Sequence, residues 1–333
     1  MTKVTREKRF LRRGMFGFCL VMIFMLLSFA AASGAEYPGK TIQVIVPYNA
    51  GGSTDTLTRI LGKKLQDVLG QPIVVVNKVG GNTVVGTLAV LGAPPDGYTL
   101  LCSEALINTT LVIKNVGYAV SDFSAFSVAA STPQFVIVNA NAPWNTLEEF
   151  IADAKKNPGK YTFSSGGPGT ISRLAGELFQ MQTGTQLTNV AYSGAALESM
   201  TAVLGGHVNM SFLSSMMCKP QYAAGKIKML AAMYPQRFKD FPNVPTTMEK
   251  GYPDMIATMW IGYFAAAKTP APVLKKLYDA FNQALRDKEI ASLVEKTGFV
   301  IENPDLQNIP KFIANEKQKW TNVVEVIKKK EKL

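Results

Sequence analysis

Histidine is almost missing from this chain of 333 residues, which contains only His207, and cysteine occurs three times. A Ser-His-Asp triad needs a histidine as its general base, and catalytic zinc sites usually use two or three histidines. His207 follows two glycines and precedes an expected strand, which is typical of a surface turn. The chain also lacks G-x-S-x-G, C-x-x-C, H-E-x-x-H and G-x-x-x-x-G-K-[ST] motifs. We therefore expect no enzyme activity, no bound metal and no cofactor.

The first 35 residues have the pattern of a secretory signal peptide. Six basic residues precede an uncharged apolar run over 14–29, and small residues follow as far as Ala35. The run is shorter than the ~20 residues of a membrane span, so a cleaved signal is favoured over a retained anchor. Cleavage is expected after Ala35, with Ala32 as the alternative. Cys19 lies inside the apolar run, so it is not interpreted as a lipid-anchoring cysteine.

Charge does not decide the function. The leader holds six basic residues and one acid, so +5 of the formal net charge of +11 belongs to it and about +6 remains. A positive field raises the local concentration of anionic ligands, but it also simply favours solubility. The basic tail over 328–332 is interpreted as a frayed helix end, and no nucleic-acid partner is expected.

Two cysteines remain beyond the leader, Cys102 and Cys218. Each lies in an apolar stretch, and they are far apart in the sequence. An oxidising compartment would allow them to pair. The apolar surroundings favour two buried free thiols.

Short apolar runs alternate with amphipathic segments from residue 42 onward, which predicts α/β sheets flanked by helices. Strands are expected at 42–47, 73–76, 98–102, 135–138, 161–164, 187–192, 208–213, 227–233 and 255–265. Helices are expected at 56–69, 80–91, 146–156, 172–182, 195–204 and 216–224, with two or three more after Pro270. The run at 73–76 is nearly all apolar, which predicts a strand covered on both faces. Thr146 and Glu149 have the spacing of a capping box.

The alternation restarts near residue 136, which predicts two α/β units. The first covers 36–135 and the second 136–253, and the helices of 254–333 are expected to pack back on the first. This arrangement needs at least two crossings of the chain between the lobes and leaves a hinged cleft.

Three loops carry the candidate chemistry, at 47–55, 164–170 and 192–196. Each joins a strand to a helix, and the carboxyl edge of an open α/β sheet is where ligands bind. Glycines allow close approach of the backbone, and amides at a helix N-terminus favour an anion. Plain turn chemistry is the alternative for each loop. Arg173, one turn beyond the second loop, could pair with a carboxylate or face solvent.

Family-like stretches run through the chain in a fixed order. They include Val46-Pro47 with Gly51-Gly52 and Asp55, Leu69-Gly-Gln-Pro72, Ala93-Pro with Asp96-Gly-Tyr-Thr-Leu100, Leu174-Ala-Gly-Glu-Leu-Phe179, Phe241-Pro with Val244-Pro-Thr246, and Trp260 with Gly262. In these stretches the chain resembles the solute receptors of tripartite tricarboxylate transporters, the Bug family.

The resemblance implies a type II periplasmic-binding-protein fold that closes like a Venus flytrap, each lobe a mostly parallel sheet flanked by helices. It implies a periplasmic monomer that binds a small carboxylate (a di- or tricarboxylate, an acidic amino acid or an aromatic acid) and delivers it to integral-membrane transporter subunits. A ligand-sensing receptor for a signalling partner is the alternative, and a secreted hydrolase or isomerase is less favoured.

The resemblance also points to ligand-binding positions in the first two loops and nearby, with Asp55 expected to shape its loop rather than touch an anion. These positions are Tyr48, Gly51, Gly52, Ser53, Asp55, Asn108, Ser165, Gly167, Gly169 and Thr170. The third loop and the end of the strand at 208–213 add Tyr192, Ser193, Gly194 and Ser214.

Two departures from the family pattern bear on the ligand. Phe-Asp-Asn is usual where this chain has Phe212-Leu213-Ser214. The missing aspartate removes a partner for an ammonium group, which makes an amino-acid ligand less expected. Arg173 stands where a histidine is common, and a second anion contact there would suit a dicarboxylate.

Overall fold

Parallel βαβ units open the fold, as the alternation of apolar strands and amphipathic helices predicts. The computed structural model describes residues 37–113, 115–192 and 195–331. β1 (Ile42–Val46) lies between β2 (Ile73–Asn77) and β3 (Thr99–Ser103) and is parallel to both. α2 (Ser53–Leu69) and α3 (Val84–Leu91) connect them. Gly70 ends α2 in the left-handed conformation, with φ of 66°, as its place in the sequence predicts.

All of these elements belong to one compact unit, Lys40–Leu333. The expected signal peptide and its cleavage site fall on residues 1–36, outside the described part of the chain. In the part that the structure describes, no helix is long and apolar enough to cross a bilayer.

β2 differs from the prediction in its surroundings. It is an edge strand that lies at one end of the strand order, with β1 as its neighbour. Val74 is 43% exposed, so the predicted covering of this strand on both faces is wrong. A run of valines satisfies the strand preference of β-branched residues at an edge as well as at a centre.

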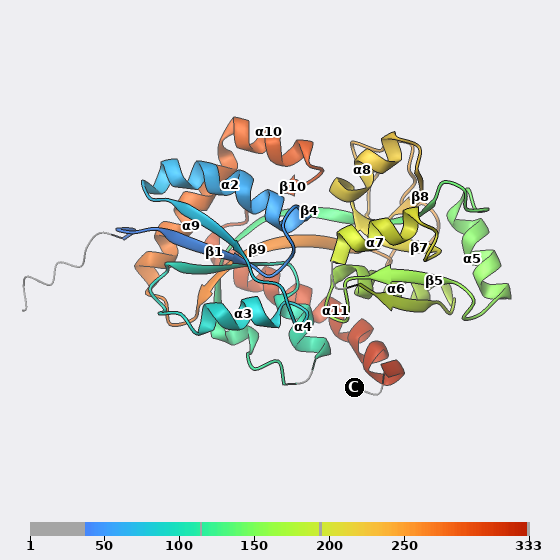
Figure 1. Cartoon of the computed structure of the whole chain (residues 1–333), viewed down its shortest axis with the longest axis horizontal. Helices are drawn as coiled ribbons and strands as arrows, with labels where there is room; N and C mark the ends of the chain where they lie inside the picture. The colour runs from blue at the N-terminus through green and yellow to red at the C-terminus, as the bar shows by residue number, and fades with distance from the viewer. Residues whose placement is uncertain (1–36, 114, 193–194, 332–333) are drawn as a thin grey trace, which may run out of the picture. The chain divides into compact units, whose positions relative to one another are not determined.

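A long strand, β4 (Phe123–Asn139), joins two sheets (Figure 1). Its first part pairs antiparallel with β9 (Thr258–Ala266) over Phe123–Pro133, in the sheet that contains β1. Its last part lies between β7 (Met210–Ser214) and β8 (Ile227–Ala232) and is antiparallel to both. We call the first sheet A and the second sheet B.

The remaining strands of sheet B are β5 (Thr162–Ser165) and β6 (Thr188–Ala191). β5 lies between β6 and β7 and is parallel to both. Its helices are α5 (Leu147–Lys156), α6 (Ile171–Thr183), α7 (Ala195–Leu204) and α8 (Ser215–Ala223). The capping box of α5 is confirmed, because Thr146 Oγ1 accepts the Glu149 amide at 3.2 Å and Glu149 Oε2 accepts the Thr146 amide at 3.3 Å. Each sheet is mixed: the βαβ pairs are parallel, and the strands that join them are antiparallel.

Three helices close the chain: α9 (Ala271–Arg286), α10 (Lys288–Lys296) and α11 (Ile309–Glu331). α9 and α10 pack on α2, whereas α11 packs on both α4 (Leu106–Val112) and α6. A two-residue strand, β10 (Val300–Ile301), pairs with β4, and 3₁₀ turns occupy Val120–Asp122 and Leu306–Asn308. The strand β10 is too short to leave a pattern in the sequence.

Aromatic side chains fill a core beside each sheet. Against sheet B, Phe135 meets Phe241 with ring centroids 5.2 Å apart and Phe238 at 5.9 Å. Against sheet A, Trp260 and Phe264 belong to a second cluster.

Cys102 and Cys218 are buried free thiols, as predicted. Burial raises the pKa of Cys102 to about 12, so its thiol stays protonated and unreactive at neutral pH.

Candidate functional site

The N-terminal ends of four helices line one cavity. The helices are α2, α6, α7 and α8. The lining residues are Tyr48, Asn49, Gly52, Ser53, Thr54, Glu104, Gln134, Thr170, Ile171, Ser172, Ala196, Leu197, Phe212, Leu213, Ser214 and Met259.

The N-caps that line the cavity leave the first-turn amides of their helices uncapped. Gly52, Thr170 and Ser214 precede α2, α6 and α8, and none of them accepts a hydrogen bond from its helix through a side chain. Thr170 Oγ1 instead donates to the Gly167 carbonyl at 2.8 Å. Uncapped amides and the positive end of the helix dipole favour an anion at this place.

The remaining wall of the cavity is apolar. Buried side chains form most of it, and Leu197 is the more exposed exception. The apolar lining comprises Ile171, Ala196, Leu197, Phe212, Leu213 and Met259. The site thus combines donors for an anion with a surface for a carbon skeleton.

One hydrogen bond spans the cavity between the two sheets. Ser53 Oγ at the start of α2 lies 3.1 Å from Ser214 Oγ at the end of β7, and both side chains are buried. It links residues 161 positions apart in the chain. The described structure is therefore closed at this point.

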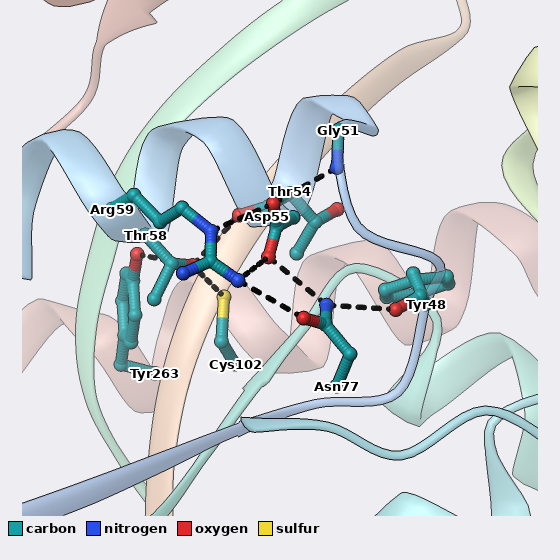
Figure 2. A network of polar contacts seen from close by, with 9 residues as sticks. All are labelled: Tyr48, Gly51, Thr54, Asp55, Thr58, Arg59, Asn77, Cys102 and Tyr263. Carbon is teal, nitrogen blue, oxygen red and sulfur yellow. Dashed lines mark hydrogen bonds and ion pairs between the residues drawn. The ribbon is translucent and has the colours of Figure 1, made fainter. Parts of the chain in front are cut away.

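Asp55 organises the first loop, as expected (Figure 2). Its Oδ2 accepts the Gly51 amide at 2.9 Å and Arg59 Nε at 3.0 Å, and its Oδ1 accepts Asn77 Nδ2 at 2.9 Å. Asn77 Nδ2 also donates to the Tyr48 carbonyl at 3.0 Å. Burial acts to raise the pKa of Asp55, but the hydrogen bonds from these donors outweigh it and lower the pKa. The carboxylate is thereby fixed in the loop and does not line the cavity.

Two glycines of the second loop permit a close approach of the backbone to the first α/β unit. A Cβ on Gly169 would lie 2.8 Å from Thr109 Cα on α4. Gly167 has φ of 104° and lies against the side chain of Asn82. Neither glycine lines the cavity, so their place in the structure indicates closure of the loops rather than direct contact with a ligand.

The other predicted positions are distributed unevenly. Tyr48, Gly52, Ser53, Thr170 and Ser214 line the cavity, whereas the remaining described positions do not. Those that do not are Gly51, Asp55, Asn108, Ser165, Gly167, Gly169, Arg173 and Tyr192. Ser193 and Gly194 lie outside the described residues.

Arg173 requires a correction. It is only 4% exposed, so the alternative of a solvent-facing side chain is wrong. It pairs with Glu177 Oε1 at 3.0 Å and lies over the Phe163 ring, 5.8 Å from its centroid. Glu177 also receives Lys330 of α11 at 2.6 Å. The guanidinium therefore forms a buried ion pair within α6, which Lys330 of α11 also joins through Glu177, and its position gives no support to the predicted contact with a second ligand carboxylate.

Five polar residues of the cavity were not among the predicted positions: Asn49, Thr54, Glu104, Gln134 and Ser172. Glu104 directly follows β3, at the same sheet edge as the first loop, and that placement could have identified it. Gln134 lies where β4 leaves sheet A, in a part of the strand that has no clear pattern. Burial raises the pKa of Glu104 to about 7.

The described ranges contain no group of three or more His, Cys, Asp or Glu side chains that could hold a metal ion. His207 is exposed in the turn after α7, where its amide donates to the Ala202 carbonyl at 2.9 Å.

A family model described as "Tripartite tricarboxylate transporter family receptor" matches residues 57–329. The chain belongs to this receptor family. Protein BugT of Bordetella pertussis is 33% identical over 301 residues, covering 89% of this chain and 91% of that protein. The family predicted from the sequence is thereby confirmed.

Solved structures agree with the fold of this receptor. The periplasmic binding protein BugD has a TM-score of 0.79 at 28% identity, covering 88% of this chain and 98% of that one. MatC from Rhodopseudomonas palustris, with bound malate, has a TM-score of 0.80 at 25% identity, covering 86% and 100%. The receptor therefore has the two-lobed α/β fold of periplasmic solute-binding proteins, as predicted.

Proposed function

We propose that this receptor captures a small carboxylate in the cavity between its sheets. It then delivers the ligand to the integral-membrane subunits of a tripartite tricarboxylate-type transporter. The observation that carries the proposal is the convergence of four helix N-termini on one cavity, with side-chain caps absent at Gly52, Thr170 and Ser214. Uncapped amides are donors without a preferred partner, and a carboxylate oxygen satisfies several of them at once.

The binding residues that we propose are the predicted positions that line the cavity: Tyr48, Gly52, Ser53, Thr170 and Ser214. Gly51 and Asp55 hold the first loop, and Gly167 and Gly169 allow the second loop to approach it. Ser165 holds the second loop, because its hydroxyl accepts the Gly167 amide at 3.3 Å, and its carbonyl accepts the Tyr192 amide at 2.8 Å.

The lobes that we propose follow the two sheets. Sheet A with the C-terminal helices forms one lobe, predicted at 36–135 plus 254–333, and sheet B forms the other, predicted at 136–253. The pairing of β4 favours a division between Pro133 and Gln134, two residues before the predicted boundary. A hinge at this point would open the cavity and separate Ser53 from Ser214.

Location and mode of action follow from the family. The signal pattern and the periplasmic relatives support a periplasmic location. We propose further that the receptor acts as a monomer and catalyses no reaction. The neighbour MatC contains malate, which supports a carboxylate ligand here.

Ligand screening tests this proposal. The protein is expressed from its full coding sequence, purified from the periplasm, unfolded to remove bound ligand and refolded. A ligand that binds only the native state at a hundredfold excess over Kd stabilises it by ~2.7 kcal/mol, which is a shift of several degrees. We expect shifts with carboxylates and none with the matched amides or esters. Shifts with neutral sugars alone would contradict the proposal.

A matched pair of variants tests the role of the amides. Ser53 is the first residue of α2, where proline is tolerated, and Gly52 before it has the extended backbone that proline requires. Ser53→Pro removes both the amide proton and the hydroxyl, whereas Ser53→Ala removes only the hydroxyl. We expect Ser53→Pro to weaken carboxylate binding at least about tenfold more than Ser53→Ala. Equal affinities would show that the Ser53 amide does not contact the ligand.

A further inference from the structure

Three polar atoms in the cavity wall have no hydrogen-bond partner among the described residues. They are Tyr48 Oη, Glu104 Oε2 and Gln134 Nε2, and all three atoms are shielded from solvent. Gln134 as a whole is only 2% exposed. Buried polar groups in native proteins are normally paired, so unpaired ones that face a cavity indicate where a ligand supplies the partner.

The contrast with the neighbouring loop is informative. The side chains of Asp55 and Asn77 find their hydrogen-bond partners within the protein: they bond to each other, to Gly51 and Arg59, and to the Tyr48 carbonyl. Burial raises the pKa of Tyr48, and the Ser103 hydroxyl and the Glu104 backbone, which lie close to its phenol, act to lower it. Of the buried side-chain atoms without a partner in the described part of the chain, those of Tyr48, Glu104 and Gln134 line the cavity. Others, such as Thr132 Oγ1 and Ser199 Oγ, lie elsewhere in the fold.

The chemistry of these three atoms defines the group that fits them. An ionised carboxylate accepts hydrogen bonds, an amide nitrogen donates them, and a phenol does both. A partner that serves Glu104 and Gln134 together must donate to one and accept from the other. A neutral hydroxyl does this, whereas an ionised carboxylate only accepts and a methyl group does neither.

The charge of the cavity lining also favours a neutral group over a second carboxylate. Among the described lining residues Glu104 is the one charged side chain, and none is lysine or arginine. Arg173 is paired with Glu177, and Arg59 with Asp55. At pH 8, above the Glu104 pKa of about 7, a second carboxylate on the ligand would therefore face a like charge without a cation to offset it.

We infer that Tyr48, Glu104 and Gln134 form a subsite for a neutral hydroxyl group. The ligand is then a monocarboxylate with an apolar body and a hydroxyl away from its carboxylate. The inference rests on the proposed function, because the helix N-termini must hold the carboxylate. The apolar wall formed by residues such as Phe212 and Met259 fits the carbon skeleton between the two polar ends. The raised pKa of Glu104, about 7, reflects the same burial.

Matched ligands test the inference. Hexanoate, 6-hydroxyhexanoate and adipate differ only at the far end, as do benzoate, 4-hydroxybenzoate and terephthalate. Calorimetric Kd values are measured at pH 8 on the refolded full-chain product. We expect the hydroxy acid of at least one series to bind about tenfold or more tighter than both of its partners.

Variants show whether Glu104 causes the preference. Glu104→Ala should reduce the gap between the hydroxy acid and the unsubstituted acid to under about threefold. Glu104→Gln removes the charge but keeps the shape, so it should improve dicarboxylate binding by about tenfold or more. Glu295→Gln, on the exposed face of α10, is the control and should change neither ratio.

The outcomes separate this inference from the function on which it depends. Tightest binding of the dicarboxylate by the unaltered protein, or ratios that Glu104→Gln leaves unchanged, would overturn the hydroxyl subsite and leave the carboxylate receptor intact. Binding of neutral sugars but of none of the six acids would overturn both.

Discussion

Glu104→Gln should make the ligand-free protein more stable at high pH and leave it nearly unchanged at low pH. Glu104 is partly buried, and burial raises its pKa from the ordinary 4.5 to about 7. The folded protein therefore holds this proton more tightly than the unfolded chain does. The free energy of unfolding must fall as pH rises through this window.

The size of the effect follows from the two pKa values. Each pKa unit corresponds to about 1.4 kcal/mol, so ionisation of Glu104 costs the folded state up to about 3 kcal/mol above pH 7. Below pH 4.5 the carboxyl is protonated in both states, and the cost disappears. Tyr48 and Cys102 interact with Glu104, but burial raises the pKa of both far above this window, so neither titrates within it.

Urea unfolding of both proteins at pH 4.5, 6 and 8 checks the prediction. The variant's advantage in the free energy of unfolding should grow by about 3 kcal/mol between the first and last pH. The comparison between the two proteins cancels the other groups that titrate, and Glu295→Gln should show no such trend. An advantage that stays constant within ~0.5 kcal/mol would refute the burial of this carboxyl.

Three further substitutions test other parts of the structure. Asp55→Asn should lower the free energy of unfolding by about 1–3 kcal/mol at pH 7. The difference should shrink in acid, because a carboxylate of lowered pKa stabilises the fold above its unfolded pKa and loses that effect as pH falls. Urea unfolding at pH 7 and pH 3 measures both values. Gly169→Ala should weaken ligand binding about tenfold or more, since the added Cβ would clash with Thr109. Gly92→Ala is the control: its Cβ would lie at an ordinary 3.5 Å from the Leu88 carbonyl, and calorimetry should show unchanged binding. Thr146→Ala should cost about 1 kcal/mol in thermal unfolding by removing the cap of α5.

The sequence predicts the outer parts of both sheets well, because their signals are local. An apolar strand, a glycine-rich loop and an amphipathic helix occur within about thirty residues of each other. The centre of the fold is harder. The first part of β4 carries Ser127, Ser131 and Thr132 at buried positions and includes Pro133, so it has neither alternation nor a continuous apolar run. Its strand conformation depends on β9, about 130 residues later, which no local pattern reveals.

The same distinction applies to the site. The loop residues Gly52, Ser53 and Thr170 were predictable, because every βα connection of an open sheet reaches the same edge. Gln134 was not, since it lies just before the predicted strand at 135–138, and the first part of β4 was not recognised. Arg173 was assigned to the ligand from its distance to the second loop, but which neighbour a helical side chain meets depends on packing. In the fold its neighbours are Glu177 and Phe163.

The placement of the donors explains why binding and closure should be coupled. Ser53 belongs to a helix on sheet A, whereas Thr170 and Ser214 belong to sheet B, so a carboxylate between them gains its full set of hydrogen bonds only when the lobes are together. Without ligand, the lobes meet at the loops through the Ser53–Ser214 hydrogen bond and through the packing of Gly169 against Thr109. A single neutral hydrogen bond contributes only about 0.5–1.5 kcal/mol. Shifting a two-state equilibrium from mostly open to mostly closed needs several kcal/mol of differential affinity. The charge-assisted bonds of a carboxylate to amides from both lobes supply energy of that order. The ligand, rather than the protein's own contacts, should therefore determine when the receptor presents its closed form to a membrane partner.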